Sequence, residues 1–398
     1  MAKRRKEGLM NSGRIVFAQL MDFLPRYEFQ RCVQRYSGNH RVRTFTCYDQ
    51  LLSMAFAQLT GRESLRDTVT CLRAMRPKLY HAGLRGAIAR STLSDANELR
   101  DWRIYADFAQ VLIRKARTLY ADDAFGVALQ QTAYAFDSTT IDLCLQLFPW
   151  ARFRRHKGGV KMHTLIDLRG NIPCFVHITD ALTHDVKALD ELPLEPGAFY
   201  VMDRAYTDFE RLYRFTRNAS FFITRAKRNL DFVWRASHPI DKSTGLRSDQ
   251  TIALCGPKTS RLYPNPLRRI TYIDATTGRR FIFLTNNFWL PAFLIAELYH
   301  CRWQIELFFK WIKQHLHIKA FYGTSENAVK TQIWIAVCVF VLVAIVKREL
   351  HIDRSLSEIL NILSITLFEN TPIILALNTI DGASEKAAID NQLNLFKS

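Results

Sequence analysis

Paired cysteines are missing from this sequence of 398 residues. Its eight cysteines are scattered singly, and no two of them have CxxC spacing. A zinc site would need such closely spaced ligands, so the pattern argues against one. Most of the cysteines stand among apolar residues. They indicate small core side chains of a protein in a reducing compartment.

Long apolar segments are also missing. The longest apolar run, Ile333 to Val346, has 14 residues, which is too short to span a bilayer and predicts a buried helix. Met1 to Lys6 is basic but no apolar stretch follows it, so no signal peptide is indicated. The absence of both features predicts a cytoplasmic location. Hydrophobic residues make up 48% and charged residues 23% of the chain, which argues against disorder.

Acidic residues are too few to balance the basic ones. The sequence has 37 Asp and Glu against 55 Lys and Arg, which gives a net charge of +18. Residues 1–120 hold 22 basic and 10 acidic residues, so +12 of this charge lies in under a third of the chain. Cations that neutralise phosphates release counterions, so nucleic acid is the favoured partner. A membrane surface is the competing interpretation, but no basic amphipathic helix beside a lipid anchor supports it.

The first 125 residues predict an all-helical domain. Thr46 can cap one helix, Gly61 interrupts it, and Ser64 can start the next. A long amphipathic helix is expected from about Trp102 to Leu119. Helix pairs joined by tight turns suit DNA binding and plain bundles equally. The basic charge favours a DNA-binding domain.

Strands and helices alternate from about residue 126. Three strands, of which the second and third form a hairpin around Gly170-Asn171, precede alternating helices and strands. This order predicts an α/β fold, namely a ribonuclease-H-like catalytic domain over residues 126–350. Strand-like pieces at about 226–286 predict an inserted β subdomain, and residues 351–398 a C-terminal helical segment and tail. The expected strands of the main sheet are Thr132–Phe136, Val160–Leu168, Ile172–Thr179, Phe199–Met202 and Phe221–Thr224.

Two aspartates are expected at the carboxyl ends of buried strands. Asp137 ends the first predicted strand and Asp203 ends the fourth. A carboxylate in this position is unfavourable unless it is paired or binds a cation. The first and fourth strands are neighbours in the predicted topology, so the two carboxylates should meet at one edge. A Mg²⁺ ion would relieve their repulsion.

The third acid, Glu306, stands on a helix predicted from Leu290 to His317. At about 100° per residue, Tyr299, Arg302, Glu306 and Lys313 fall within one arc of roughly 60°, and apolar residues occupy the adjoining face. One acid among cations fits a metal ligand beside phosphates. A solvated, salt-bridged helix face is the alternative.

These residues carry a resemblance to a known family. Tyr299, Arg302, Glu306 and Lys313 are similar to the Y-(2)-R-(3)-E-(6)-K motif of the IS4 family of bacterial insertion-sequence transposases, and the two aspartate segments resemble its acidic motifs. The separations are 66 residues between the aspartates and 103 from Asp203 to Glu306. The likeness covers roughly residues 130–350. The second motif has Asp-Arg-Ala-Tyr where Asp-Arg-Gly-Tyr is commoner.

The resemblance implies a DDE transposase of the bacterial cytoplasm and nucleoid. Asp137, Asp203 and Glu306 would bind two Mg²⁺ or Mn²⁺ ions, and Tyr299, Arg302 and Lys313 would contact transposon-end phosphates. It also implies double-stranded DNA as substrate, both inverted-repeat ends and target, and a homodimer in the synaptic complex. Base flipping onto an aromatic side chain would involve Trp303 or Trp289, although either could be a core residue.

Further candidates lie outside the acidic motifs. Four cations of a glycine-containing loop between the first two strands could follow a DNA backbone, namely Arg154, Arg155, Lys157 and Lys161. A solvated loop is the alternative. Asp185 is one of several residues that could support the metal ligands, although a helix cap is the favoured interpretation. His163 and His177 are expected to be core histidines.

Two other functions remain open from the sequence. The chain could be a DNA-binding regulator that has lost catalysis, although all three acids are present. It could also be a nuclease that cuts without joining strands. Detection of joined products, and not only of nicks, separates these possibilities.

Overall fold

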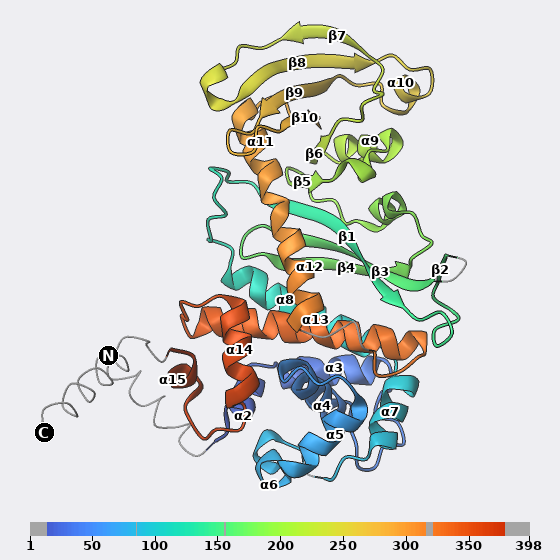
Figure 1. Cartoon of the computed structure of the whole chain (residues 1–398), viewed down its shortest axis with the longest axis vertical. Coiled ribbons are helices and arrows are strands. Elements are labelled where there is room, and N and C mark those ends of the chain that lie inside the picture. Colours follow the sequence, from blue (N-terminus) through green and yellow to red (C-terminus); the bar gives the residue numbers. More distant parts are fainter. Residues whose placement is uncertain (1–13, 85, 155–156, 316–320, 379–398) are drawn as a thin grey trace, which may run out of the picture. The chain divides into compact units, whose positions relative to one another are not determined.

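The computed structural model describes residues 14–84, 86–154, 157–315 and 321–378 (Figure 1). The chain divides into two compact units. The first, here called the helical unit, comprises residues up to Leu112, His315–Gly323 and residues from Asn327 onward. The second, here called the sheet unit, comprises Ile113–Gln314 and Thr324–Glu326.

The helical unit is built from helices of both ends of the chain. Thr46 begins α4 with a capping box to Asp49, and the Ser64 side chain accepts from the backbone N–H of Asp67 to begin α5. Both predicted helix starts are confirmed. The helices are α2 (Val16–Met21), α3 (Arg26–Arg35), α4 (Cys47–Leu59), α5 (Leu65–Ala74), α6 (Arg76–Leu79), η1 (Tyr80–Ala82), α7 (Arg90–Leu99), the first part of α8 (Arg103–Leu119), α13 (Glu326–Glu349), α14 (Leu356–Thr366) and α15 (Ile373–Asn378).

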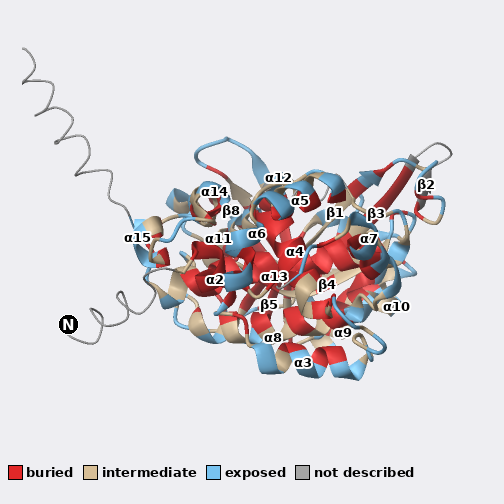
Figure 2. Cartoon of the chain, turned by 90° about the horizontal axis from the view of Figure 1, so that it is seen from below, coloured by how far each residue is buried: buried red, intermediate tan, exposed pale blue. Residues whose placement is uncertain are grey.

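Helix α13 contains the apolar run that predicted a buried helix. With 24 residues it is longer than that run, and it is long and apolar enough to cross a membrane by length and composition alone. However, 94% of its most apolar window is buried inside the structure, and Figure 2 shows red, buried residues along it. The prediction of a buried helix is confirmed.

The sheet unit contains a ten-stranded sheet. Strand β1 pairs antiparallel with β3, which pairs antiparallel with β4, so the predicted hairpin is confirmed. On its other side β1 pairs in parallel with β5, which pairs in parallel with β6. The first and fourth predicted strands are therefore neighbours. The strands are β1 (Ala133–Leu143), β2 (Arg152–Arg154), β3 (Lys157–Asp167), β4 (Ile172–Asp180), β5 (Phe199–Met202) and β6 (Phe221–Arg225).

The segment predicted to be an inserted β subdomain continues the same sheet. Strand β10 pairs antiparallel with β6, and β9, β8 and β7 follow in that order (Figure 1). The sequence predicted parts of three of these strands and missed β7, which is mostly exposed and has no alternating apolar pattern. Their bounds are β7 (Phe232–Ser237), β8 (Leu246–Leu254), β9 (Leu267–Ile273) and β10 (Arg280–Thr285).

Helix α9 (Phe209–Arg217) packs on the central strands. Its buried residues Phe209, Leu212 and Phe215 recur every third position, and the ring of Phe215 lies edge-on to those of Tyr200 and Phe222. The other helices of this unit are the last part of α8, η2 (Asp185–Glu191), η3 (Arg204–Tyr206), α10 (Thr259–Leu262), α11 (Ala292–Cys301) and α12 (Trp303–His315).

Candidate active site

Asp137 and Asp203 lie side by side in the sheet register. The parallel pairing of β1 with β5 ends at Phe136 opposite Met202, and each aspartate is the next residue. The expectation that Asp137 ends its strand is wrong, because β1 runs on to Leu143. Beyond Asp137 this strand pairs with β3 alone, since β5 has already ended. The two aspartates therefore stand at a step in the sheet where one side of β1 becomes free for other groups.

The Asp137 carboxylate is held by the chain itself. The backbone N–H of Ser138 donates to Oδ1 at 2.8 Å, and Nη1 of Arg302 donates to Oδ2 at 3.0 Å. Burial raises the pKa of Asp137 to about 6, against the opposing effects of these two donors, and the negative charges of Asp203 and Glu306 raise it further. Three acids, one within β1, one directly after β5 and one on α12, are thus close enough to repel one another.

The helix predicted from Leu290 to His317 forms two helices, α11 and α12, that meet at Arg302. Arg302 keeps right-handed helical dihedrals, with φ −54° and ψ −28°. The backbone hydrogen bonds tighten there to a three-residue spacing, from Arg302 to Tyr299 and from Ile305 to Arg302. Because the turn stays helical, the predicted arc of side chains survives the interruption.

Arg302 connects two of the acids. Its Nη2 donates to Oε1 of Glu306 at 2.5 Å while Nη1 contacts Asp137. The side chain of Arg302 is 16% exposed, against 21% for Asp137 and 35% for Glu306, so the bridge is largely shielded from water. One guanidinium therefore neutralises carboxylates from the sheet and from α12 at the same time.

Tyr299 and Lys313 reach the same edge of the sheet. The hydroxyl of Tyr299 donates to Oδ1 of Asp203 at 3.4 Å, and its ring packs against Phe283 at 4.8 Å between centroids. The ammonium of Lys313 donates to the carbonyl of Thr140 at 2.9 Å. The structure thus brings together all six residues of the two aspartate segments and the Y-R-E-K motif that the sequence singled out.

The donor chemistry of this site suits a divalent cation. Carboxylate oxygens are the ligands that Mg²⁺ and Mn²⁺ prefer. Burial, and to a smaller extent the charges of Asp203 and Glu306, raises the pKa of Asp137, and a bound cation would favour its ionised form. Within the described ranges, however, no three His, Cys, Asp or Glu side chains converge closely enough to hold a metal as they stand. Arg302 is the cation that bridges Asp137 and Glu306. The residue types fit a divalent ion, on condition that this guanidinium moves.

The two candidate tryptophans lie in different places. Trp303 is 57% exposed and stands one turn before Glu306 on α12. Trp289 is 54% exposed, and its ring lies edge-on to Phe199 and Phe221, the first residues of β5 and β6. Those are the ends of the strands opposite to Asp203. Of the two, only Trp303 is beside the acids.

The predicted DNA-binding loop is described only in part. Arg154 ends β2 and Lys157 begins β3, and Arg155 lies outside the described residues. Lys161 is 13% exposed, and its ammonium contacts the Thr183 carbonyl at 2.7 Å and the Asp185 carboxylate at 3.1 Å. Its charge is therefore already used inside the chain.

Asp185 lies next to the site, which agrees with its predicted supporting role and not with the favoured prediction of a helix cap. It was expected to cap a helix, but it is the first residue of η2, whose N-cap His184 makes no side-chain cap. Its carboxylate instead accepts from the Ser138 hydroxyl at 2.9 Å, next to Asp137. No spacing in the sequence connects these residues, because 47 positions separate them.

Acids at the end of a buried parallel strand pair, with cations in contact with them, are typical of metal-dependent enzymes that act on phosphodiesters. Comparison with known families makes the class specific: the chain belongs to the DDE transposase family, because residues 128–342 match the transposase DDE domain. Residues 12–85 match a domain of unknown function, DUF4372. Membership makes the chain a metal-dependent enzyme that cuts and joins DNA strands, as the sequence predicted.

Individual relatives are similar over part of the chain. "Putative transposase y4zB" of Sinorhizobium fredii is 34% identical over 60% of this chain and 67% of its own length. "Probable transposase for insertion sequence element IS5377" of Geobacillus stearothermophilus is 34% identical over 52% of this chain, which spans about half (54%) of that relative. Among solved structures, a piggyBac transposase synaptic complex with hairpin DNA is similar with a TM-score of 0.46 and 9% identity, over 96% of this chain and 85% of that one.

Proposed function

We propose that this chain is a transposase of the IS4 type, which cuts DNA at the ends of an insertion sequence and joins the 3′-hydroxyls to target DNA. The observation that carries the proposal is the meeting of Asp137, Asp203 and Glu306 at the step between β1 and β5. These three acids come from three elements of the fold. They are the catalytic residues in this proposal.

Asp137, Asp203 and Glu306 would hold two Mg²⁺ or Mn²⁺ ions. Such ions, when bound, increase the nucleophilicity of the attacking water or 3′-hydroxyl and stabilise the leaving oxygen. Asp137 offers Oδ2 once Arg302 has left it, while its Oδ1 stays fixed by the backbone N–H of Ser138. The chain's part in the reaction is to keep the three carboxylates ionised and oriented.

The three remaining motif residues would contact the DNA phosphates. The Tyr299 hydroxyl donates a hydrogen bond to Asp203, and the Lys313 ammonium donates one to the β1 backbone beyond Asp137. Arg302 lies between Asp137 and Glu306. A DNA phosphate offers Arg302 a bidentate partner equal to a carboxylate. DNA binding would therefore draw Arg302 from the acids as the substrate arrives. Trp303, exposed beside Glu306, is the candidate to stack on a flipped base.

The strand order supports a ribonuclease-H-like catalytic domain over about residues 126–350. Strands β4, β3 and β1 form an antiparallel set, followed by β5 and β6 in parallel. Strands β7 to β10 would be the β insertion before Glu306, joined edge to edge to that sheet. The DNA-binding domain predicted over residues 1–125 would correspond to the helical unit, which also includes α14 and α15 from the segment predicted to be separate and C-terminal. Arg154, Arg155 and Lys157 would follow the DNA backbone.

The assembly proposed is a homodimer that holds two inverted-repeat ends in a synaptic complex and then captures target DNA. It would work in the bacterial cytoplasm, at the nucleoid. The basic excess of the chain supports DNA as the partner.

The test is cleavage and joining of a DNA that carries the element's own inverted repeats, with Mg²⁺ or Mn²⁺. Glu306→Gln is expected to abolish both reactions, whereas Glu210→Gln, an exposed acid on α9, should leave both unchanged. Cleavage by Glu306→Gln at the wild-type rate would refute the assignment. Nicked products that are never joined would indicate a nuclease, and binding without cleavage in any metal would indicate a regulator.

A further inference from the structure

The sheet unit contains a second basic site that is separate from the Y-R-E-K motif. It is a cavity of about 220 Å³ between η3, the end of β6 and the strands β9 and β10. Two aromatic rings, Phe232 and Phe281, line part of it. Six cations line the rest, and this set, here called the arginine pocket, comprises Arg204, Arg225, Lys227, Arg228, Arg269 and Arg280. Among the residues that the structure describes, none that lines the cavity is acidic.

The arginine pocket lies next to the catalytic acids. Arg204 is the residue after Asp203, and Arg225 follows Thr224, whose hydroxyl donates to the Asp203 carbonyl at 3.1 Å. The ring of Phe281 is 6.3 Å from that of Tyr299, which itself contacts Asp203. A strand of DNA whose scissile phosphate lay at Asp203 would therefore have its next phosphates within reach of this cavity.

The charge of the pocket is not neutralised by the chain. Within the part of the chain that the structure describes, none of the six cations forms an ion pair with a carboxylate. Lys227 donates to the Thr207 carbonyl at 2.8 Å and Arg269 to the amide oxygen of Gln250 at 3.1 Å, which are both uncharged. Burial lowers the pKa of Arg269, and the charge of Arg280 lowers it further.

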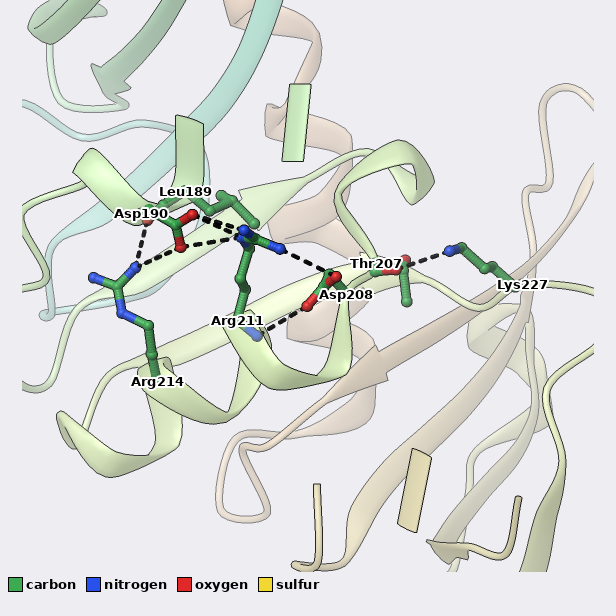
Figure 3. A network of polar contacts seen from close by, with 7 residues as sticks. All are labelled: Leu189, Asp190, Thr207, Asp208, Arg211, Arg214 and Lys227. Atoms are coloured by element: carbon green, nitrogen blue, oxygen red, sulfur yellow. Dashed lines mark hydrogen bonds and ion pairs between the residues drawn. The ribbon is translucent and has the colours of Figure 1, made fainter. Parts of the chain in front are cut away.

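Neighbouring arginines behave differently. Figure 3 shows Arg211 and Arg214 of α9 directed at the carboxylate of Asp190, with Arg211 also contacting Asp208. In the same view Lys227 reaches only a backbone oxygen. Among the described residues, acids thus pair with Arg211 and Arg214 of α9, whereas none pairs with a cation of the arginine pocket. Such a concave, uncompensated basic site attracts an anion from solution.

The small volume of the pocket and the contacts of its two phenylalanine rings with arginines favour a phosphate as its occupant. The guanidinium of Arg225 lies 5.8 Å from the centre of the Phe281 ring, and that of Arg269 lies 5.1 Å from the centre of Phe232. Both rings are therefore engaged by cations, which they hold in place by cation–π attraction. A volume of about 220 Å³ is below the roughly 300 Å³ at which pockets for whole small molecules begin. A phosphate group fits within this volume.

We propose that the arginine pocket binds phosphate groups of the DNA strand adjoining the scissile position. The inference rests on the proposed function, because it takes the strand at Asp203 as its starting point. Guanidinium groups bind phosphates in a bidentate manner and stay charged. Several arginines around one small cavity would fix the strand on one side of the cut while the motif residues hold the scissile phosphate.

The test measures binding of a fluorescent ten-residue oligothymidylate to the full chain in EDTA, so that no cleavage occurs. The double variant Arg228→Gln/Arg280→Gln removes two exposed cations of the pocket, and Arg279→Gln removes an exposed neighbour that does not line it. The double variant should bind about tenfold more weakly. The slope of log affinity against log salt should become shallower by about 1.4, for two lost phosphate contacts to a single strand. Arg279→Gln should match the wild type. Arg269→Gln, a second pocket variant, should weaken binding as well.

Three results would overturn the inference. The first is an equal loss of affinity in Arg279→Gln, which would mean that bulk charge alone matters. The second is wild-type affinity in both pocket variants. The third is displacement of the oligonucleotide by millimolar inorganic phosphate, which would mean a small-anion site. Oligonucleotide binding in EDTA and DNA cleavage with Mg²⁺ are measured separately, so a failure of the pocket and a failure of the proposed catalysis can be told apart.

Discussion

At the scale of single residues, Arg302 has the most unusual position in the chain. It contacts Asp137 and Glu306 at once, while Asp203 is contacted by Tyr299. An arginine between two acids neutralises the pair without a metal, and it has to be displaced before the same oxygens can bind one. In the proposed function, metal binding by these acids would therefore depend on a substrate phosphate that draws Arg302 away.

Removal of that guanidinium should expose the repulsion between the acids. In EDTA, Arg302→Gln is expected to destabilise the chain by about 1–3 kcal/mol, because two largely shielded carboxylates lose their charged partner. Mn²⁺ should stabilise this variant more than it stabilises the wild type, since the metal binds the native acids without competition. Chemical unfolding with and without Mn²⁺ measures both effects. Arg31→Gln, which breaks an exposed pair with Glu28, is the control and should cost less than about 1 kcal/mol. Equal stability of Arg302→Gln and wild type in EDTA would contradict the role given to Arg302.

His163 should make the folding stability of the chain depend on pH. It is fully buried on β3, and Thr179 contacts its Nε2 at 3.0 Å. Burial lowers its pKa to about 4, helped by His177 and Lys161 and opposed by Asp185. An unfolded histidine titrates at about 6.5. The unfolded chain therefore gains a proton between pH 6.5 and 4 that the folded chain does not, and stability present above pH 6.5 is lost as the pH falls through this range.

We expect this histidine to cost the wild type about 2 kcal/mol of stability between pH 7.5 and pH 5. His163→Gln should lose correspondingly less stability over the same pH interval, whatever its stability at pH 7.5. His40→Gln, an exposed histidine of the helical unit, should follow the wild type. Urea unfolding at the two pH values gives the comparison. If His163→Gln loses as much stability as the wild type between pH 7.5 and pH 5, another group is responsible for the loss.

At the scale of elements, the sequence predicted patterns that repeat locally and missed those that depend on partners. The arc of Tyr299, Arg302, Glu306 and Lys313 follows from helical periodicity and is found in the structure. The true end of β1 does not, because the strand continues wherever β3 offers backbone partners. Trp289 is another example. It lies shortly before α11 in sequence, but its ring contacts the first residues of β5 and β6, at the end of these strands opposite to Asp203.

The turn that begins β8 depends on a single glycine. Gly245 has φ +90°, and a Cβ there would lie 2.5 Å from the carbonyl oxygen of Ile273, which is backbone and cannot turn away. Gly278, in the turn between β9 and β10, has φ +67° with open space around it. Gly278→Ala should therefore cost about 1–2 kcal/mol for the left-handed backbone alone. Gly245→Ala should cost clearly more, and the two unfolding free energies, measured side by side, test this difference. If the two substitutions lower the unfolding free energy equally, the backbone around Gly245 can shift to accept a Cβ.

At the scale of the whole molecule, each unit joins segments that are distant in sequence. The side chain of Gln19 on α2 donates to the Thr371 carbonyl and accepts from the backbone N–H of Ile373, more than 350 residues away. Such contacts leave no local pattern, so the sequence predicted helices at both ends of the chain without predicting that they form one unit. Charge, in contrast, is additive along the chain. The basic excess of the first 120 residues was visible from composition alone.

That excess should make binding to double-stranded DNA of any sequence strongly salt-dependent. Arg66 and Arg90 are exposed at the starts of α5 and α7, and they line one cavity of the helical unit together with three serines and two acids, Glu63 and Asp95. If this unit contacts the duplex backbone, Arg66→Gln/Arg90→Gln should flatten the plot of log affinity against log salt by about 1.8, for two phosphate contacts. Arg103→Gln should have a smaller effect, because Asp101 already neutralises that guanidinium at 2.6 Å. The oligothymidylate affinity of both variants should stay at the wild-type value, because the arginine pocket belongs to the sheet unit. If the double variant keeps the wild-type slope, these arginines do not contact the duplex. The sheet unit would then be the main source of DNA affinity.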